Sequence, residues 1–232
     1  MSAPTVPPVR SAPRISICQL ALYLVARAGS RLSIIRQQRR PETFRTIRYE
    51  DAHRAVRRVV SAGDDWRSVL ASERARIAAA AGGTEFEVEN RRLSLAALDA
   101  FGDHWQGHDL QGFEVIPGNP NAGKQRVSEV VVSVRPELLL RGTDPTGRPM
   151  YGAIKLRFSS TRPMPSEGAD YVAAMVHWHL ERNHPPGSVD RSRCFFLDVC
   201  TGTITAAPVA FKKRRKDIEA ACREIFIGWE TL

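Results

Sequence analysis

Apolar residues recur at helical spacing through most of the first hundred residues. Between Tyr49 and Ala62 the apolar positions lie three or four residues apart, which places them on one face of a helix. Ser16 is of a type that caps helices, and Pro41 and Gly63 are of types that end them. The pattern predicts helices over residues 16–28, 30–40, 49–62, 65–81 and 95–105. The chain is therefore expected to begin with a helical module.

The pattern changes after residues 107–123, which are rich in Gly, Asn and Pro and are expected to form a long loop. The segments that follow are short, apolar and β-branched, and turn residues at 143–147 separate two of them. They predict strands over 127–134, 137–141, 151–158, 193–199 and 203–208, with helices over 166–182 and 214–229. The first three strands are expected to form an antiparallel meander.

These elements predict an α+β fold, with a helical module followed by an α/β core and a C-terminal helix. We expect residues 1–13 to be a flexible tail, 14–92 a basic helical module and 93–232 the core. A weak likeness of the tail to a transit sequence is the alternative interpretation.

Positive charge is concentrated in the first third of the chain. The chain carries 34 Lys and Arg against 25 Asp and Glu, a formal charge of +9, and residues 1–65 hold twelve Arg, no Lys and five acids. Seven of the nine excess charges therefore lie in this segment. Such a surface attracts polyanions, nucleic acid before membrane.

The cysteines and the hydropathy limit the classes of protein to which the chain can belong. Cys18, Cys194, Cys200 and Cys222 form no CxxC pair and no Cys/His cluster with zinc spacing, which indicates reduced thiols and no zinc site. No apolar run approaches the length of a membrane span. We expect a cytoplasmic protein without a membrane partner.

The strand around Lys155 carries the first candidate for chemistry. Its alternation places Ile154 and Leu156 on one face, with Lys155 and Arg157 on the other. Lys155 is one of only five lysines in an arginine-dominated chain, and its ammonium suits phosphate charge or a nucleophilic water. The alternative is a lysine at a sheet edge that reaches solvent.

Glu137 follows Pro136 at the start of the preceding antiparallel strand and is expected to face Lys155. Here the chain resembles the PD-(D/E)xK, or restriction-endonuclease-like, nuclease superfamily, whose core has the order αβββαβ. Pro136-Glu137 stands at the family's Pro-Asp, and Lys155 at its lysine. The order of elements from Ser94 to Pro208 also resembles that core.

The resemblance implies a metal-dependent phosphodiesterase in which Glu137 binds Mg²⁺ or Mn²⁺ and Lys155 orients the attacking water. Ala153 stands where the family has its second acidic ligand, so Glu167 and Asp170 on the following helix are the candidates to replace it. For Glu167 the competing interpretation is favourable interaction with the helix dipole beside Ser166. Arg157 is a candidate to bind a neighbouring phosphate.

Arginines of the helical module are candidates to bind a nucleic-acid backbone without reading sequence. A solvated face is the competing interpretation. The candidates are Arg36, Arg39, Arg40, Arg45, Arg57 and Arg58.

Three functions follow. The first is a nuclease, or a nuclease-related subunit, in nucleic-acid processing or in defence against phage or plasmid DNA, acting on DNA rather than RNA. The second is a catalytically inactive nucleic-acid-binding or assembly subunit that keeps the fold, with Ala153 marking the lost metal site. The third is a structural protein whose basic surface meets an acidic protein partner in a larger complex.

Overall fold

The computed structural model describes residues 9–41, 48–105, 110, 112–119, 123–159 and 162–231, and Arg45 lies outside them. The helices are α1 (Ile17–Val25), α2 (Ala28–Arg39), α3 (Glu50–Ser61), α4 (Trp66–Ala78), α5 (Glu85–His104), α6 (Ser166–Asn183) and α7 (Phe211–Glu230). The strands are β1 (Arg14–Ser16), β2 (Glu114–Pro117), β3 (Lys124–Val127), β4 (Val130–Ser133), β5 (Leu138–Thr143), β6 (Pro149–Arg157), β7 (Val189–Asp198) and β8 (Thr203–Ala206). The fold is mixed α and β, as predicted.

The larger sheet has five strands in the order β2-β5-β6-β7-β8. β2, β5 and β6 are antiparallel neighbours, β7 runs parallel to β6 after α6, and β8 is antiparallel to β7. A separate three-stranded sheet has the order β1-β4-β3, with β1 parallel to β4.

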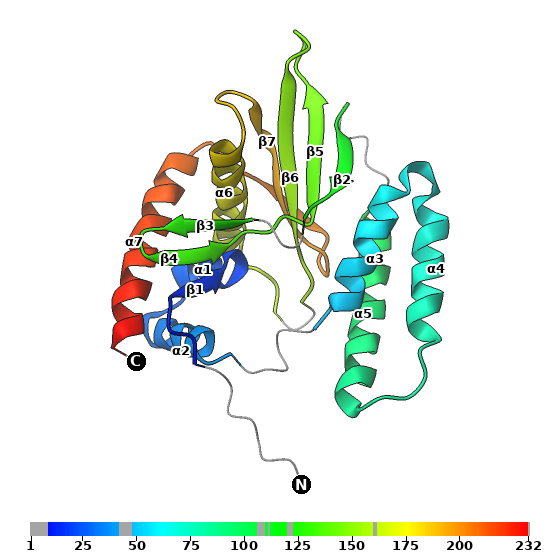
Figure 1. Ribbon diagram of the computed structural model, residues 1–232, viewed down its shortest axis with the longest axis horizontal. Helices are drawn as coiled ribbons and strands as arrows, with labels where there is room; N and C mark the ends of the chain where they lie inside the picture. Colours follow the sequence, from blue (N-terminus) through cyan, green and yellow to red (C-terminus); the bar gives the residue numbers. More distant parts are fainter. Residues whose placement is uncertain are drawn as a thin grey trace.

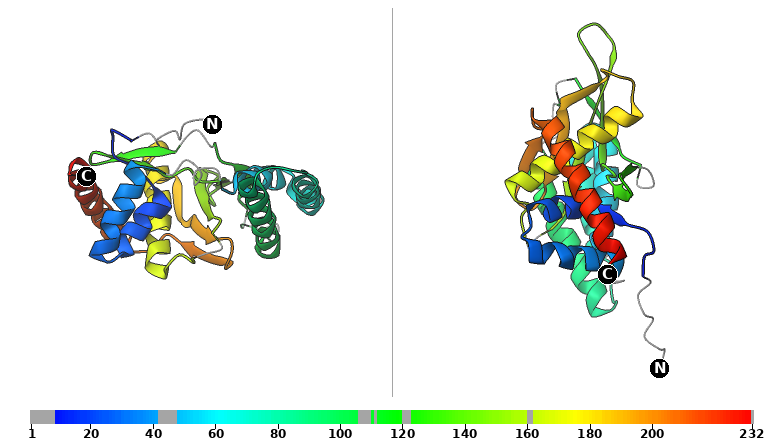
Figure 2. Two further views of the ribbon diagram at one scale, coloured as in Figure 1. Left: turned by 90° about the horizontal axis from the view of Figure 1, so that it is seen from below. Right: turned by 90° about the vertical axis from the view of Figure 1, so that its left-hand side faces the viewer.

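The larger sheet lies between two groups of helices, α3, α4 and α5 on one side and α1, α2, α6 and α7 on the other (Figures 1 and 2). The alternation of β6 explains this arrangement. Ile154, Leu156 and Phe158 join the core under α3 and α5, whereas Ala153 joins the core under α1 and α6. Full burial of a side chain of the size of Leu156 contributes roughly 1.5–3 kcal/mol.

The predicted strand over 127–134 is wrong. Residues 127–134 instead contain the last residue of β3, a turn and the whole of β4, because the chain reverses at Ser128, which adopts a left-handed conformation with φ of 50°. The first strand of the meander is instead β2, inside the segment predicted to be a loop. Its four residues lie between glycines and are too few to show an alternating pattern.

Two helices begin earlier than predicted. α5 begins at Glu85 rather than near Leu95, because Thr84 and Glu87 form a capping box in which each side chain bonds to the other residue's backbone N–H. α7 begins at Phe211 rather than Arg214. Ser16 caps α1, as expected, by accepting a hydrogen bond from the backbone N–H of Gln19 at 3.3 Å.

Residues 14–92 are divided between the two sides of the larger sheet. α1 and α2 pack against α7, where the Tyr23 hydroxyl donates to Glu224 at 3.1 Å and Arg39 donates to the carbonyl of Trp229 at 2.8 Å. α3 and α4 pack with α5 in the other core. None of the helices in the described residues has the length and apolar character needed to cross a membrane.

Candidate functional site

Glu137 and Lys155 meet at the point where β5 begins beside β6. Leu138 pairs with Ile154 in the antiparallel ladder, which places Glu137 next to Lys155. The Lys155 ammonium donates to one carboxylate oxygen of Glu137, Oε1, at 2.7 Å. The two side chains are only 7% and 13% exposed, respectively, so this is a largely buried ion pair.

The remaining polar atoms of the pair bind backbone groups. The other carboxylate oxygen, Oε2 of Glu137, accepts the N–H of Leu156 at 2.7 Å, and Lys155 also donates to the carbonyl of Arg135 at 3.0 Å. The backbone at Gly118 fixes this position, because its N–H donates to the carbonyl of Glu137 at 2.7 Å and an added Cβ would lie 2.1 Å from the carbonyl of Pro136. Both oxygens of Glu137 are therefore occupied by protein donors.

His53 on α3 is a third member of this cluster. Its Nδ1 lies 3.6 Å from Oε1 of Glu137, and its ring meets the edge of Phe158 with centroids 4.7 Å apart. Burial lowers the pKa of His53, against the opposing effect of Glu137. The sequence offers no signal for His53, because one histidine beside the apolar positions of a helix carries no signature of a site.

Arg157, the candidate phosphate ligand on β6, is bound within the protein. It donates to Asp198 at 2.8 Å and to the carbonyl of Arg162 at 2.6 Å, and its side chain is 11% exposed. Asp198 also accepts the N–H of Met164 at 2.9 Å. These bonds hold Arg162 and Met164, which precede α6, close to β6 and β7.

Glu167 and Asp170 do not join Glu137. Both carboxylates accept hydrogen bonds from Arg214 on α7, each at 3.0 Å, and the Arg214 guanidinium lies over the ring of Tyr171. These acids thus connect α6 to α7.

The carboxylates in the described residues are not arranged to bind the magnesium or manganese ion expected from the sequence. These ions need several oxygen ligands with free lone pairs, whereas Lys155 and the backbone occupy Glu137, and Arg214 occupies the two helix acids. Within the described residues no group of three or more His, Cys, Asp or Glu side chains is placed to hold a metal.

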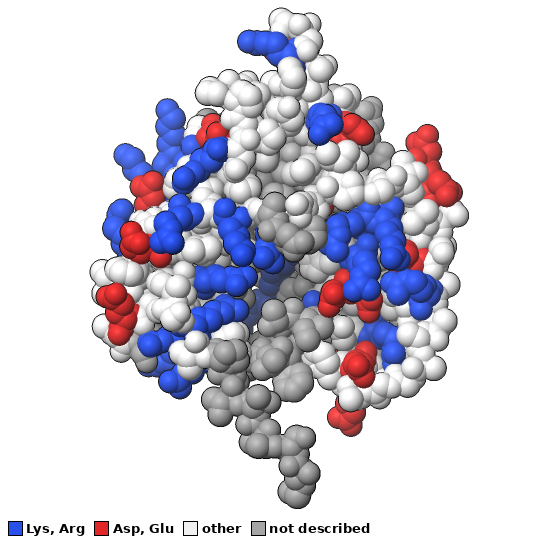
Figure 3. Space-filling view, viewed as in Figure 1, with Lys and Arg blue, Asp and Glu red and all other residues white. Residues whose placement is uncertain are grey.

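The candidate arginines of α2 differ in their exposure. Arg36 and Arg40 are exposed, whereas Arg39 is half-buried and binds the carbonyl of Trp229. Lysine and arginine side chains gather over both sides of the face seen in Figure 3. One of these groups lies over α3.

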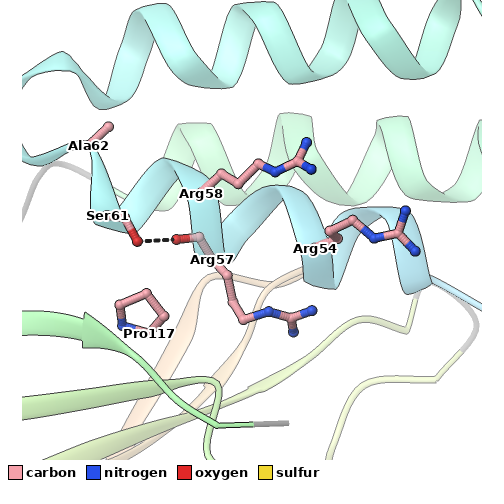
Figure 4. Close-up of a pocket in the computed structure, with 6 residues that line it drawn as sticks. All are labelled: Arg54, Arg57, Arg58, Ser61, Ala62 and Pro117. Atoms are coloured by element: carbon pink, nitrogen blue, oxygen red, sulfur yellow. Dashed lines mark hydrogen bonds between the residues drawn. The ribbon is translucent and has the colours of Figure 1, made fainter.

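Three arginines of α3 line one shallow hollow of about 390 Å³, which we call the arginine hollow (Figure 4). Its walls are Arg54, Arg57, Arg58, Ser61, Ala62 and Pro117 of β2. The hollow is lined by residues of α3 and of β2, the edge strand of the larger sheet.

The three arginines of the hollow are not equally engaged. Arg58 pairs with Glu73 at 2.6 Å and Arg54 with Glu50 at 3.0 Å. Among the described residues, no carboxylate lies within ion-pair distance of Arg57, whose guanidinium extends into the space between α3 and β2 (Figure 4). Arg57 therefore offers its hydrogen-bond donors to a ligand.

No protein-family model matches this chain, and a search of curated proteins found no sequence match.

Proposed function

We propose that this protein binds nucleic acid, and that the phosphate backbone lies in the arginine hollow of α3. The arrangement of Arg54, Arg57 and Arg58 around one hollow carries the proposal. A guanidinium has five donors in a planar fork that matches the oxygens of a phosphate group. The net charge of +9 favours the approach of a polyanion to the protein.

Binding of this kind is expected to depend on charge more than on base sequence. Arginines that contact phosphates fix the position of the protein on its ligand but do not distinguish bases. We therefore propose the phosphate backbone as the group that is bound, and because its charge is the same in DNA and RNA, both are tested.

The order of elements supports a relation to the nuclease fold expected from the sequence. α5, the meander β2-β5-β6, α6 and β7 follow one another in the order αβββαβ, with the β3–β4 hairpin inserted between the first and second strands of the meander. Within this arrangement Glu137 and Lys155 serve as a structural ion pair. We accordingly propose binding without cleavage.

The binding test compares two single substitutions that remove the same charge. Arg57→Gln lies in the arginine hollow, whereas Arg141→Gln lies on the exposed side of β5 outside that hollow. Fluorescence anisotropy with labelled duplex DNA, single-stranded DNA and RNA measures the dissociation constant at several salt concentrations. Arg57→Gln is expected to weaken binding and to reduce the salt slope by about one, with Arg141→Gln close to wild type.

Two results would contradict the proposal. Equal losses in both variants would show that general charge, and not the hollow, governs binding. Hydrolysis of the labelled DNA or RNA in Mg²⁺ or Mn²⁺ that Glu137→Gln and Lys155→Met abolish would show that the Glu137–Lys155 pair is catalytic. Both of these variants need to be folded, by circular dichroism, for that result to count.

A further inference from the structure

The helix that carries the arginine hollow also carries His53, on the side nearest Glu137. His53 and Arg57 are four residues apart on α3, so their side chains leave the helix on the same face and one turn apart. The charge of Arg57 is close enough to influence the titration of His53. His53 therefore lies one helical turn from Arg57 of the arginine hollow and beside Glu137 of the buried pair.

The two ring nitrogens of His53 have different surroundings. Nδ1 faces the Glu137 carboxylate at 3.6 Å, which favours a proton on that nitrogen. Nε2 is on the far side of the ring, and in the neutral imidazole it then has a lone pair and no proton. The lone pair of Nε2 and the lone pairs of a phosphate oxygen placed beside it repel each other.

Protonation changes Nε2 from an acceptor into a donor. The imidazolium is then attracted to the Glu137 carboxylate, which lies 3.6 Å from Nδ1, while Nε2 donates to a second acceptor. The His53 side chain is 33% exposed, so a ligand can reach it from solvent.

We propose that His53 is a phosphate ligand that acts only in its protonated form and extends the arginine hollow toward Glu137 and Lys155. The inference rests on the proposed function, since it concerns the same nucleic-acid backbone. It makes the affinity for nucleic acid increase as the pH falls.

The charges around His53 set the pH at which this change occurs. Glu137 at the start of β5 and Glu50 on α3 favour the protonated form, whereas Lys155 on β6 and Arg57 on α3 oppose it. Burial has the largest effect and lowers the pKa of His53 below its usual value of 6.5. The imidazole is therefore neutral at pH 7, and a bound phosphate, which adds negative charge beside the ring, favours its protonated form.

The experiment measures DNA binding by anisotropy at about pH 8 and about pH 5.5, with a dye that does not titrate between them. Phosphodiesters stay anionic over this range, and any titration of the bases is common to all variants. The wild-type protein is expected to gain about five- to tenfold more affinity than His53→Gln on acidification. Its salt slope is expected to steepen by about 0.9 for the added contact.

Two further variants complete the comparison. His53→Arg carries a permanent charge and is expected to bind at about pH 8 as tightly as the wild type does at about pH 5.5. His184→Gln is the matched control, because His184 also has a pKa lowered by burial but stacks on Tyr151, at the opposite end of β6 from Phe158. It is expected to keep the wild-type pH response.

The outcomes separate this inference from the proposed function. If His53→Gln is folded and keeps the wild-type pH response, His53 is not the ligand, although binding through Arg57 stands. If the wild-type protein binds no nucleic acid at either pH, both proposals fail. If His53→Gln and His184→Gln lose the pH response equally, the effect belongs to general charge and the inference is overturned.

Discussion

Removing one member of the buried Glu137–Lys155 pair is expected to destabilise the protein strongly. In Lys155→Met, the Glu137 carboxylate remains 7% exposed and loses its closest charged partner, although the N–H of Leu156 and the His53 ring stay beside it. Leaving a buried charge unpaired costs roughly 3–5 kcal/mol, and the two remaining neighbours place this variant near the lower end. For a chain of this length, about 3 kcal/mol corresponds to a fall of roughly 6–12 °C in the melting temperature.

The double variant separates the pair interaction from the loss of packing. Glu137→Gln keeps an acceptor for the N–H of Leu156 but removes the charge, and Lys155 keeps its bond to the carbonyl of Arg135. Glu137→Gln combined with Lys155→Met leaves no unpaired charge, so it is expected to cost about 1–3 kcal/mol less than the sum of the single variants. Urea unfolding followed by circular dichroism gives each free energy of unfolding.

An exposed ion pair provides the control for this cycle. Arg54 and Glu50 have side chains that are 46% and 60% exposed, so Arg54→Gln is expected to change the free energy of unfolding by less than about 1 kcal/mol. If Lys155→Met and Glu137→Gln also cost less than about 1 kcal/mol each and their effects add, the argument from burial is refuted.

Two further predictions concern buried thiols and a buried imidazole. Burial raises the pKa of the Cys222 thiol to about 12 and also raises the pKa of Cys194. A thiol reagent at about pH 8 is therefore expected to label both cysteines only after the protein unfolds. Detection of either labelled cysteine in the native protein by mass spectrometry would contradict this expectation. Burial lowers the pKa of His177 below 6.5, so the unfolded chain binds more protons and the free energy of unfolding decreases as the pH falls below about 6.5. This decrease is expected to be smaller in His177→Gln. An identical pH dependence of urea unfolding in the two proteins would show that His177 does not cause it.

Local patterns predicted the helices and the strands that have enough residues to show a period. The alternation of β6 placed Lys155 and Leu156 on opposite faces, and the antiparallel order of β5 and β6 placed Glu137 beside Lys155. These are contacts between consecutive elements, joined by a short turn. Local rules are sufficient for contacts of this kind.

The features that sequence reasoning missed depend on contacts between distant segments. β1 pairs with β4 across more than a hundred residues, and no local signal specifies that partner. The approach of His53 to Glu137 results from the packing of α3 on the sheet. Glu167 and Asp170 were candidates because the resemblance requires a second acid and they lie on the helix after the lysine strand. Whether such acids bind a metal or an arginine depends on what packs beside them, here Arg214.

The position of the first helices sets an order on folding during synthesis. β1 has no partner until β4 has been made, α1 lacks its main packing surface until α6 has been made, and α2 lacks its own until α7 has been made. The α3–α4–α5 group, by contrast, consists of consecutive elements whose mutual contacts are available early. Residues 14–39, although translated early, are therefore among the last to reach their native positions.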